Sequence, residues 1–99
     1  MVSEISIDKQ ALTEFCQAHG IRKLSLFGSV LRDDFSVDSD VDVLVEFQEG
    51  HVPGFFELSR MERTLSLQLG RKADLRTPND LSRYFRDEVV REAAVQYVA

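Results

Sequence analysis

The chain has 99 residues, of which 43% are hydrophobic, and this length supplies one hydrophobic core, so we expect a single domain over residues 1–99 with one active site. Its formal net charge of −5 argues against extended nucleic-acid binding, because clustered Lys and Arg supply most of the affinity for a phosphate backbone. A single cysteine excludes an intramolecular disulfide, and with neither a secretory leader nor a membrane-length apolar run in the sequence, we expect a soluble, cytoplasmic protein without membrane contact.

The first predicted elements are a helix and a strand. Asp8 is a favourable N-cap before a helically spaced apolar pattern, so we predict a helix over residues 9–19 that Gly20 ends. Cys16 falls on the apolar side of this helix, where we expect it to be buried rather than reactive. Residues 21–27 follow as a strand.

A glycine-serine turn and a polar stretch separate the first strand from the second. Gly28 and Ser29 follow the first strand directly, and the second strand is predicted over residues 41–47. The valines of this second strand share one face, whereas Asp42 lies on the other face, the side that Asp40 also takes. Both carboxylates therefore point the same way, with Cα atoms roughly 6.5 to 7 Å apart.

The second half of the chain is predicted as helix, strand and helix. A loop with two glycines and a proline leads into a helix over residues 55–69. Its apolar stripe consists of Phe55, Leu58, Met61, Leu65 and Leu69. Residues 72–77 form a short predicted strand from which Asp74 projects, and residues 78–97 form the last helical region. The predicted order is αβαβαβα, an α/β fold in which helices back a small sheet whose strand directions stay open.

The paired carboxylates suggest a metal site. A magnesium ion takes hard oxygen ligands, usually one or two carboxylates together with substrate phosphates, and Asp40 and Asp42 provide these around a nucleoside triphosphate. A two-metal mechanism needs a further acid, for which Asp74 on the next predicted strand is the candidate. Asp74 is also a candidate for the base that accepts the proton of an attacking hydroxyl. The pattern indicates phosphoryl or nucleotidyl transfer.

The turn after the first strand is a candidate phosphate-binding element. Gly28 lets the backbone approach a phosphate without a Cβ in the way, and Ser29 offers a hydroxyl and an amide at a helix start. We expect a short helix over residues 30–32, which brings Arg32 within reach of a phosphate as a secondary candidate. A salt bridge to a neighbouring aspartate is the alternative role for Arg32.

A calcium-binding loop is the alternative metal site. Asp38, Asp40, Asp42 and Glu49 occupy positions one, three, five and twelve of an EF-hand loop. The sixth position of such a loop requires glycine, whereas this chain has Val43 inside a predicted strand, and the flanking helices are missing. We therefore favour magnesium over calcium, and a solvated acidic strand entry is the remaining structural interpretation.

Leu-Phe-Gly-Ser at residues 26–29, followed after ten residues by Asp-Val-Asp at residues 40–42, resembles the signature of the minimal nucleotidyltransferases of the DNA polymerase β superfamily. The similarity extends to Ser39 before the first aspartate, to Gly-Phe-Phe at residues 54–56 and to Asp-Leu at residues 74–75. This resemblance implies a polymerase-β-like fold, with a small mixed sheet flanked by helices.

The resemblance also implies substrates and a partner. It implies a magnesium-dependent nucleotidyltransferase that uses two metal ions and ATP, with Asp40, Asp42 and Asp74 as the metal-binding triad and Ser39 among the nucleotide-binding residues. Stand-alone members of this size resemble the antitoxin half of toxin–antitoxin pairs, in which AMP is placed on a tyrosine of a HEPN-domain ribonuclease toxin. The expected assembly is a hetero-oligomer with that toxin.

Arg76 is the departure from the family pattern that bears on activity. It lies two residues from Asp74 on the same strand face, where relatives often carry an apolar residue, and it either binds phosphate or pairs with Asp74. A tight pair would make Asp74 a weaker metal ligand, which leaves open a non-catalytic antitoxin that neutralises its toxin by binding. A small-molecule nucleotidyltransferase of the aminoglycoside type is the further alternative, for which the short chain lacks an evident acceptor-binding domain.

Overall fold

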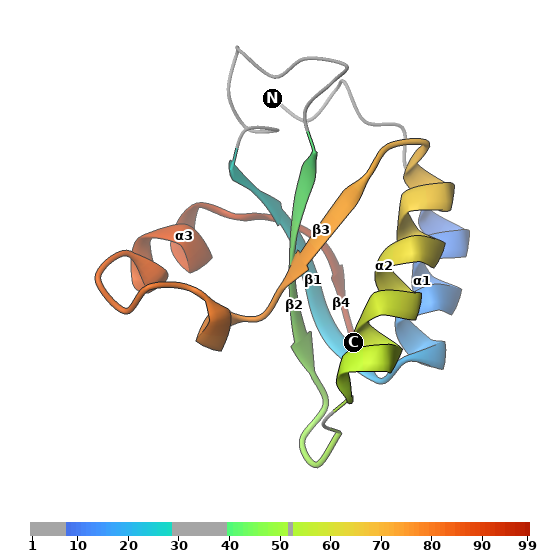
Figure 1. Cartoon of the computed structure of the whole chain (residues 1–99), viewed down its shortest axis with the longest axis horizontal. Coiled ribbons are helices and arrows are strands. Elements are labelled where there is room, and N and C mark those ends of the chain that lie inside the picture. The colour runs from blue at the N-terminus through green and yellow to red at the C-terminus, as the bar shows by residue number, and fades with distance from the viewer. Residues whose placement is uncertain (1–7, 29–39, 52) are drawn as a thin grey trace.

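The described part of the chain is a mixed sheet with two helices on one side and a third helix on the other (Figure 1). The computed structural model describes residues 8–28, 40–51 and 53–99. Its elements are α1 (Lys9–Ala18), β1 (Ile21–Phe27), β2 (Val41–Phe47), α2 (Phe55–Leu69), β3 (Ala73–Arg76), the 3-10 helix η3 (Pro78–Asp80), α3 (Arg86–Glu92) and β4 (Ala94–Val98). Within these residues, four strands lie in the order β3-β2-β1-β4, with β1 antiparallel to β2 and β4 and with β2 parallel to β3. The predicted mixed sheet flanked by helices is confirmed.

The predicted strands form the sheet and carry one side of the core. Predicted strands 21–27 and 41–47 match β1 and β2, and the predicted strand 72–77 is one residue shorter at each end, as β3. Side chains of α1 and α2 pack on one sheet face and bury the valines of β2 completely. The core on this face consists of Leu12, Phe15, Cys16, Ile21, Leu24, Leu26, Val41, Val43, Val45, Met61, Leu65 and Ala73.

The ends of α1 and α2 follow the predicted signals. The Asp8 carboxylate accepts hydrogen bonds from the backbone N–H groups of Gln10 and Ala11, at 3.0 and 3.3 Å, and so starts α1 as an N-cap. Gly70 ends α2 in the left-handed conformation, with φ of 69°. In the part of the chain that the structure describes, no helix is long and apolar enough to cross a membrane.

Cys16 is buried within α1, as expected. Burial raises the pKa of its thiol to about 12, because the low-dielectric core disfavours the thiolate. The thiol is therefore a small apolar core group at neutral pH.

Phe55 does not join the core, contrary to the predicted stripe of α2. Its side chain is 77% exposed and lies edge-on to Phe56, with the ring centroids 5.9 Å apart, whereas Met61 and Leu65 are buried. Side chains of a helix tilt toward its N-terminus, so a residue in the first turn projects past the start of the helix rather than onto the sheet. The stripe on the core therefore starts at Leu58, which is partly buried.

The predicted last helix through residue 97 is wrong, because the chain ends in a strand. After η3 and α3, Ala93 turns extended at φ −63° and ψ 141°, and β4 pairs antiparallel with β1. The apolar spacing of residues 89–97 suits a helix, but pairing along the free edge of β1 satisfies the backbone and lets Tyr97 pack on the core. Tertiary pairing overrides the helical pattern here.

Candidate active site

The parallel pairing of β2 and β3 places Asp42 beside Asp74. The two residues are direct Cα partners in the register of this pair. Register partners on neighbouring strands project to the same sheet face, with strands about 4.8 Å apart, so the two carboxylates are neighbours. This face is opposite to the one that α1 and α2 cover, because the flanking Val41 and Val43 are buried in the core. Asp40 precedes β2 and is exposed.

Gly28, the residue directly after β1, lies close to the Asp42 carboxylate. Phe27 at the end of β1 is the register partner of Asp42, so the chain passes Asp42 as it leaves the sheet. Gly28 has a φ of 76°, and a Cβ added to it would clash with Oδ2 of Asp42 and lie 3.2 Å from its Cγ. Glycine is needed here for both the backbone conformation and the close approach. Gly28 is thus held directly beside the acidic pair.

Arg76 pairs with Asp74, one of the two roles that the sequence allows. Its Nη2 lies 3.2 Å from Oδ2 of Asp74, with side-chain exposures of 47% and 32%. The hydrogen bond to Asp74 raises the pKa of Arg76 first, followed by the charge of Asp74 and smaller contributions from Asp80 and Asp42. The guanidinium therefore offsets part of the negative charge that gathers where β2 and β3 begin.

The carboxylates at this place have the chemistry that magnesium requires. Asp42 and Asp74 present hard oxygen donors side by side, and the lack of a side chain at Gly28 lets the Asp42 carboxylate lie against the backbone there. Within the described residues, no three His, Cys, Asp or Glu side chains are grouped closely enough to hold a metal ion. A triad would therefore need the exposed Asp40 to turn toward the pair and Arg76 to release Asp74. The donor set fits a magnesium ion, and the triad stays a prediction.

Comparison with known proteins settles the family. A family model described as a nucleotidyltransferase domain matches residues 8–97. The chain belongs to the nucleotidyltransferase domain family. A relative from Methanocaldococcus jannaschii is 33% identical over 85 residues, which cover 86% of this chain and 89% of the relative. The protein adenylyltransferase MntA of Thermococcus cleftensis is 34% identical over 79 residues, which cover 80% of this chain and 78% of that protein.

Solved structures confirm the nucleotidyltransferase fold. One, described as a minimal nucleotidyltransferase, is 34% identical and superposes with a TM-score of 0.69, covering 86% of this chain and 85% of the other. A toxin–antitoxin structure with AMP-PNP superposes with a TM-score of 0.73 at 16% identity, covering 94% of this chain and 75% of the other. At that identity the second likeness concerns the fold alone.

Some predicted site residues of this nucleotidyltransferase lie outside the described residues. Ser29, Arg32 and Ser39 fall within residues 29–39, so their roles in nucleotide binding stay predictions. Val43, at the sixth position of the alternative calcium loop, is a buried residue in the middle of β2, as the predicted strand requires.

His51 lies away from the acidic pair. Its ring lies against Phe47, with the centroids 5.5 Å apart, and its Nε2 is 3.7 Å from Oε2 of Glu57. Phe47 ends β2 five residues after Asp42, which separates the two by roughly 16 Å along the strand. His51 thus lies at the opposite end of the sheet from Asp42 and Asp74.

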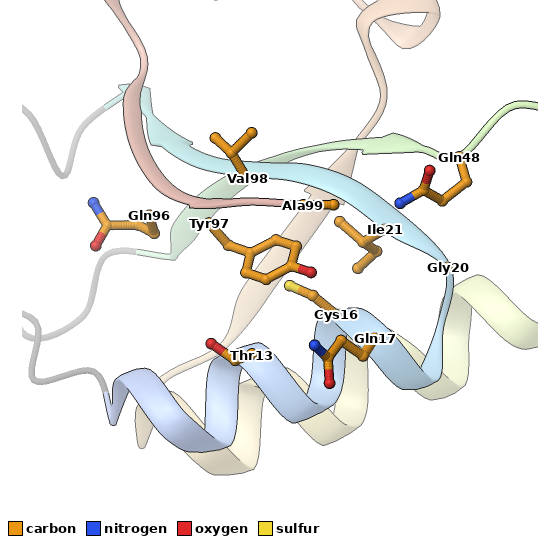
Figure 2. A pocket seen from close by; sticks show the side chains of 10 residues that line it. All are labelled: Thr13, Cys16, Gln17, Gly20, Ile21, Gln48, Gln96, Tyr97, Val98 and Ala99. Carbon is orange, nitrogen blue, oxygen red and sulfur yellow. The ribbon is translucent and has the colours of Figure 1, made fainter.

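A cavity of about 730 Å³ lies between α1 and β4 and is also separate from the acidic pair. Figure 2 shows the Tyr97 ring and the Cys16 thiol facing each other within it, with glutamine side chains around its rim. Its lining contains no acidic or basic side chain from the described residues. A triphosphate needs cations or backbone N–H donors, so this cavity is unsuited to the nucleotide.

Two residues near the site are absent from the sequence-based predictions. Glu62 and Ser66 of α2 accept hydrogen bonds from backbone N–H groups of β3 on either side of Asp74, each at 2.8 Å. Their four-residue spacing on one helix face was the available signal. The sequence alone does not show that β3 is an edge strand beside α2, so this spacing could not be interpreted.

Proposed function

We propose that the chain is a magnesium-dependent protein adenylyltransferase that acts as an antitoxin, transferring AMP from ATP to a tyrosine hydroxyl of a HEPN-domain ribonuclease toxin. The observation that carries this proposal is the in-register pair of Asp42 and Asp74 beside Gly28. A related protein from Thermococcus cleftensis is named protein adenylyltransferase MntA, and solved toxin–antitoxin structures share the fold. These likenesses support the class of acceptor, and the resemblance in the sequence supports the tyrosine and the HEPN toxin.

The proposed reaction assigns the three aspartates to the metal and the turn after β1 to the phosphates. When bound, magnesium activates the attacking oxygen and stabilises charge on the leaving pyrophosphate. Asp40, Asp42 and Asp74 hold the metal, and the turn at Gly28 and Ser29 binds phosphate oxygens through backbone N–H groups. The tyrosine oxygen forms a bond to the α-phosphorus, the bond to the β-phosphate oxygen breaks, and pyrophosphate leaves. The hydroxyl proton passes to a carboxylate oxygen, for which Asp74 is the candidate.

The test is transfer of labelled AMP between purified proteins. The chain is incubated with α-labelled ATP, magnesium and the product of the gene beside its own, and we expect the label on that product. Asp42→Asn should abolish transfer, whereas Asp87→Asn, an exposed aspartate in the first turn of α3, should leave it unchanged. Replacing the acceptor tyrosine by phenylalanine should remove the label. Transfer that survives Asp42→Asn, or no transfer by the unmodified pair, contradicts the proposal.

The ion pair of Arg76 with Asp74 favours a second candidate function, neutralisation of the toxin by binding alone. The guanidinium of Arg76 lies 3.2 Å from an oxygen of Asp74. It therefore engages a carboxylate that a metal ion would need as its third acidic ligand. In this case the chain protects against its toxin at a one-to-one ratio without ATP, and Asp42→Asn protects equally well. An ATP-dependent protection assay with catalytic amounts of the chain separates the two functions.

A further inference from the structure

Among the described residues, β3 is an edge strand whose outward N–H groups donate hydrogen bonds to side chains of α2. In a parallel pair, alternate residues turn their N–H and C=O groups toward the partner strand. The N–H of Val41 in β2 donates to the C=O of Lys72 at 2.8 Å, so Lys72 and Asp74 face β2. Ala73 and Leu75 consequently turn their N–H groups away from β2, toward α2, which runs alongside β3 (Figure 1).

Both outward N–H groups find an acceptor on α2. The N–H of Leu75 donates to Oε2 of Glu62, and the N–H of Ala73 donates to Oγ of Ser66, each at 2.8 Å. The Ser66 hydroxyl donates in turn to the C=O of Glu62 at 2.7 Å, which leaves its lone pairs for Ala73. All of these bonds are partly buried, so water replaces them poorly.

The two acceptors bracket Asp74. They hold the residue before it and the residue after it, while its own backbone faces β2. The helix that carries them is anchored in the core by Met61 and Leu65, which are 0% and 1% exposed. β3, only four residues long, is therefore fixed on its outer side as well as through its pairing with β2. The two outward N–H donors of this edge are therefore satisfied.

We propose that Glu62 and Ser66 are positioning residues for Asp74. By accepting hydrogen bonds from both amides that flank Asp74, they fix the position of β3 along β2. That position determines where the Asp74 carboxylate lies relative to that of Asp42. They touch neither nucleotide nor metal. This role rests on the proposed function in one respect, namely that Asp74 is a metal ligand.

The test compares variants that keep or remove each acceptor. Glu62→Gln and Ser66→Thr keep an acceptor oxygen, whereas Glu62→Leu and Ser66→Ala remove it. Gln68→Leu, at an exposed position of the same helix, is the matched control for a polar-to-leucine change. Amide hydrogen exchange of Ala73 and Leu75 is measured by NMR, and Mn²⁺ binding to the nucleotide-free protein is measured by calorimetry, so that neither readout needs catalysis.

We expect each removal to act on its own amide. Glu62→Leu should speed exchange at Leu75 on the order of tenfold, and Ser66→Ala should do the same at Ala73, while the control and the acceptor-keeping variants stay near wild type. Both removals should weaken Mn²⁺ binding roughly tenfold, in line with the effect of groups that orient metal ligands. Because Ser66→Ala is a small change, it tests the role even where Glu62→Leu fails to fold.

The outcomes separate this inference from the proposed function. Unchanged exchange at both amides overturns the positioning role. So does Mn²⁺ affinity that is unchanged in Glu62→Leu and Ser66→Ala but lowered in Asp74→Asn, and that result leaves the proposed function standing. Mn²⁺ affinity that is unchanged in Asp74→Asn removes Asp74 from the metal ligands and overturns the positioning role together with that part of the proposed function.

Discussion

Removing Arg76 should strengthen metal binding. In the structure its guanidinium bonds the Asp74 carboxylate at 3.2 Å, and the charges of Asp42 and Asp80 also contribute to holding it there. A metal ion bound through Asp74 must displace this guanidinium or share the carboxylate with it. Arg76→Leu removes the competitor and leaves an aliphatic side chain in its place. We therefore expect tighter binding of Mn²⁺ or Mg²⁺ to the nucleotide-free protein.

The size of the effect follows from the exposure of the Arg76–Asp74 pair. With side-chain exposures of 47% and 32%, it is a surface ion pair, and such pairs are worth about 0.2 to 1 kcal/mol. The bond is direct and charge-assisted, which favours the upper end, about 1 kcal/mol. That energy corresponds to a roughly fivefold increase in the metal association constant. The increase should shrink in high salt, because solvent-exposed charges are screened.

The assay is a calorimetric titration of Mn²⁺, with Arg91→Leu as the control. Arg91 is an exposed cation in the last turn of α3, so its replacement changes the net charge equally but leaves Asp74 untouched. We expect at most a small change in this control. Equal gains in both variants would show a net-charge effect only. Unchanged metal affinity with weaker ATP binding in Arg76→Leu would refute the competition and assign Arg76 to phosphate instead.

Further predictions concern the turn, the core thiol and the last strand. Gly28→Ala should lower the free energy of unfolding in urea by at least about 2 kcal/mol. Gly50 has a similar φ of 83° but open space where a Cβ would lie, so Gly50→Ala should lower it by about 1 kcal/mol. Equal losses would disprove the close approach at Gly28. Cys16 should resist thiol reagents at pH 8 until the protein unfolds, because burial raises its pKa to about 12; reaction of the native protein at the unfolded rate would contradict this. Tyr97→Ala should lower the free energy of unfolding by about 2 kcal/mol, because Tyr97 packs on the core. Val98 is 61% exposed, so Val98→Ala should lower it by only about 0.5 kcal/mol; the reverse order would refute the packing of β4.

Local signals in the sequence predict most elements correctly. The alternation of valines predicts β2 to the residue, and the glycine that ends α2 predicts its last turn. Each of these signals depends only on residues a few positions apart, so it can be recognised in the sequence. The pairing of β4 with β1 joins residues about seventy positions apart, and no local pattern in residues 94–98 reports it. The exposure of Phe55 likewise depends on where α2 starts relative to the sheet.

The candidate site shows the same division. Spacing along one strand predicts that Asp40 and Asp42 share a side, but the distance between Asp42 and Asp74 depends on the direction in which β3 runs. An antiparallel β3 would put Asp74 at a different height on the sheet. Glu62 and Ser66 could not be assigned from the sequence for a related reason, because their partners are backbone groups that only an edge strand leaves open.

Strand direction explains why the site forms at one end of the sheet. Asp42 and Asp74 are each the second residue of a strand, and because β2 and β3 are parallel, these second positions meet. β1 is antiparallel to β2, so its last residue arrives at the same end, and Gly28 follows it directly. A parallel pair needs a crossover, which α2 supplies between β2 and β3. The helix that sets the direction of β3 also carries the acceptors that hold it, so that a single connection both creates and fixes the pairing of the two carboxylates.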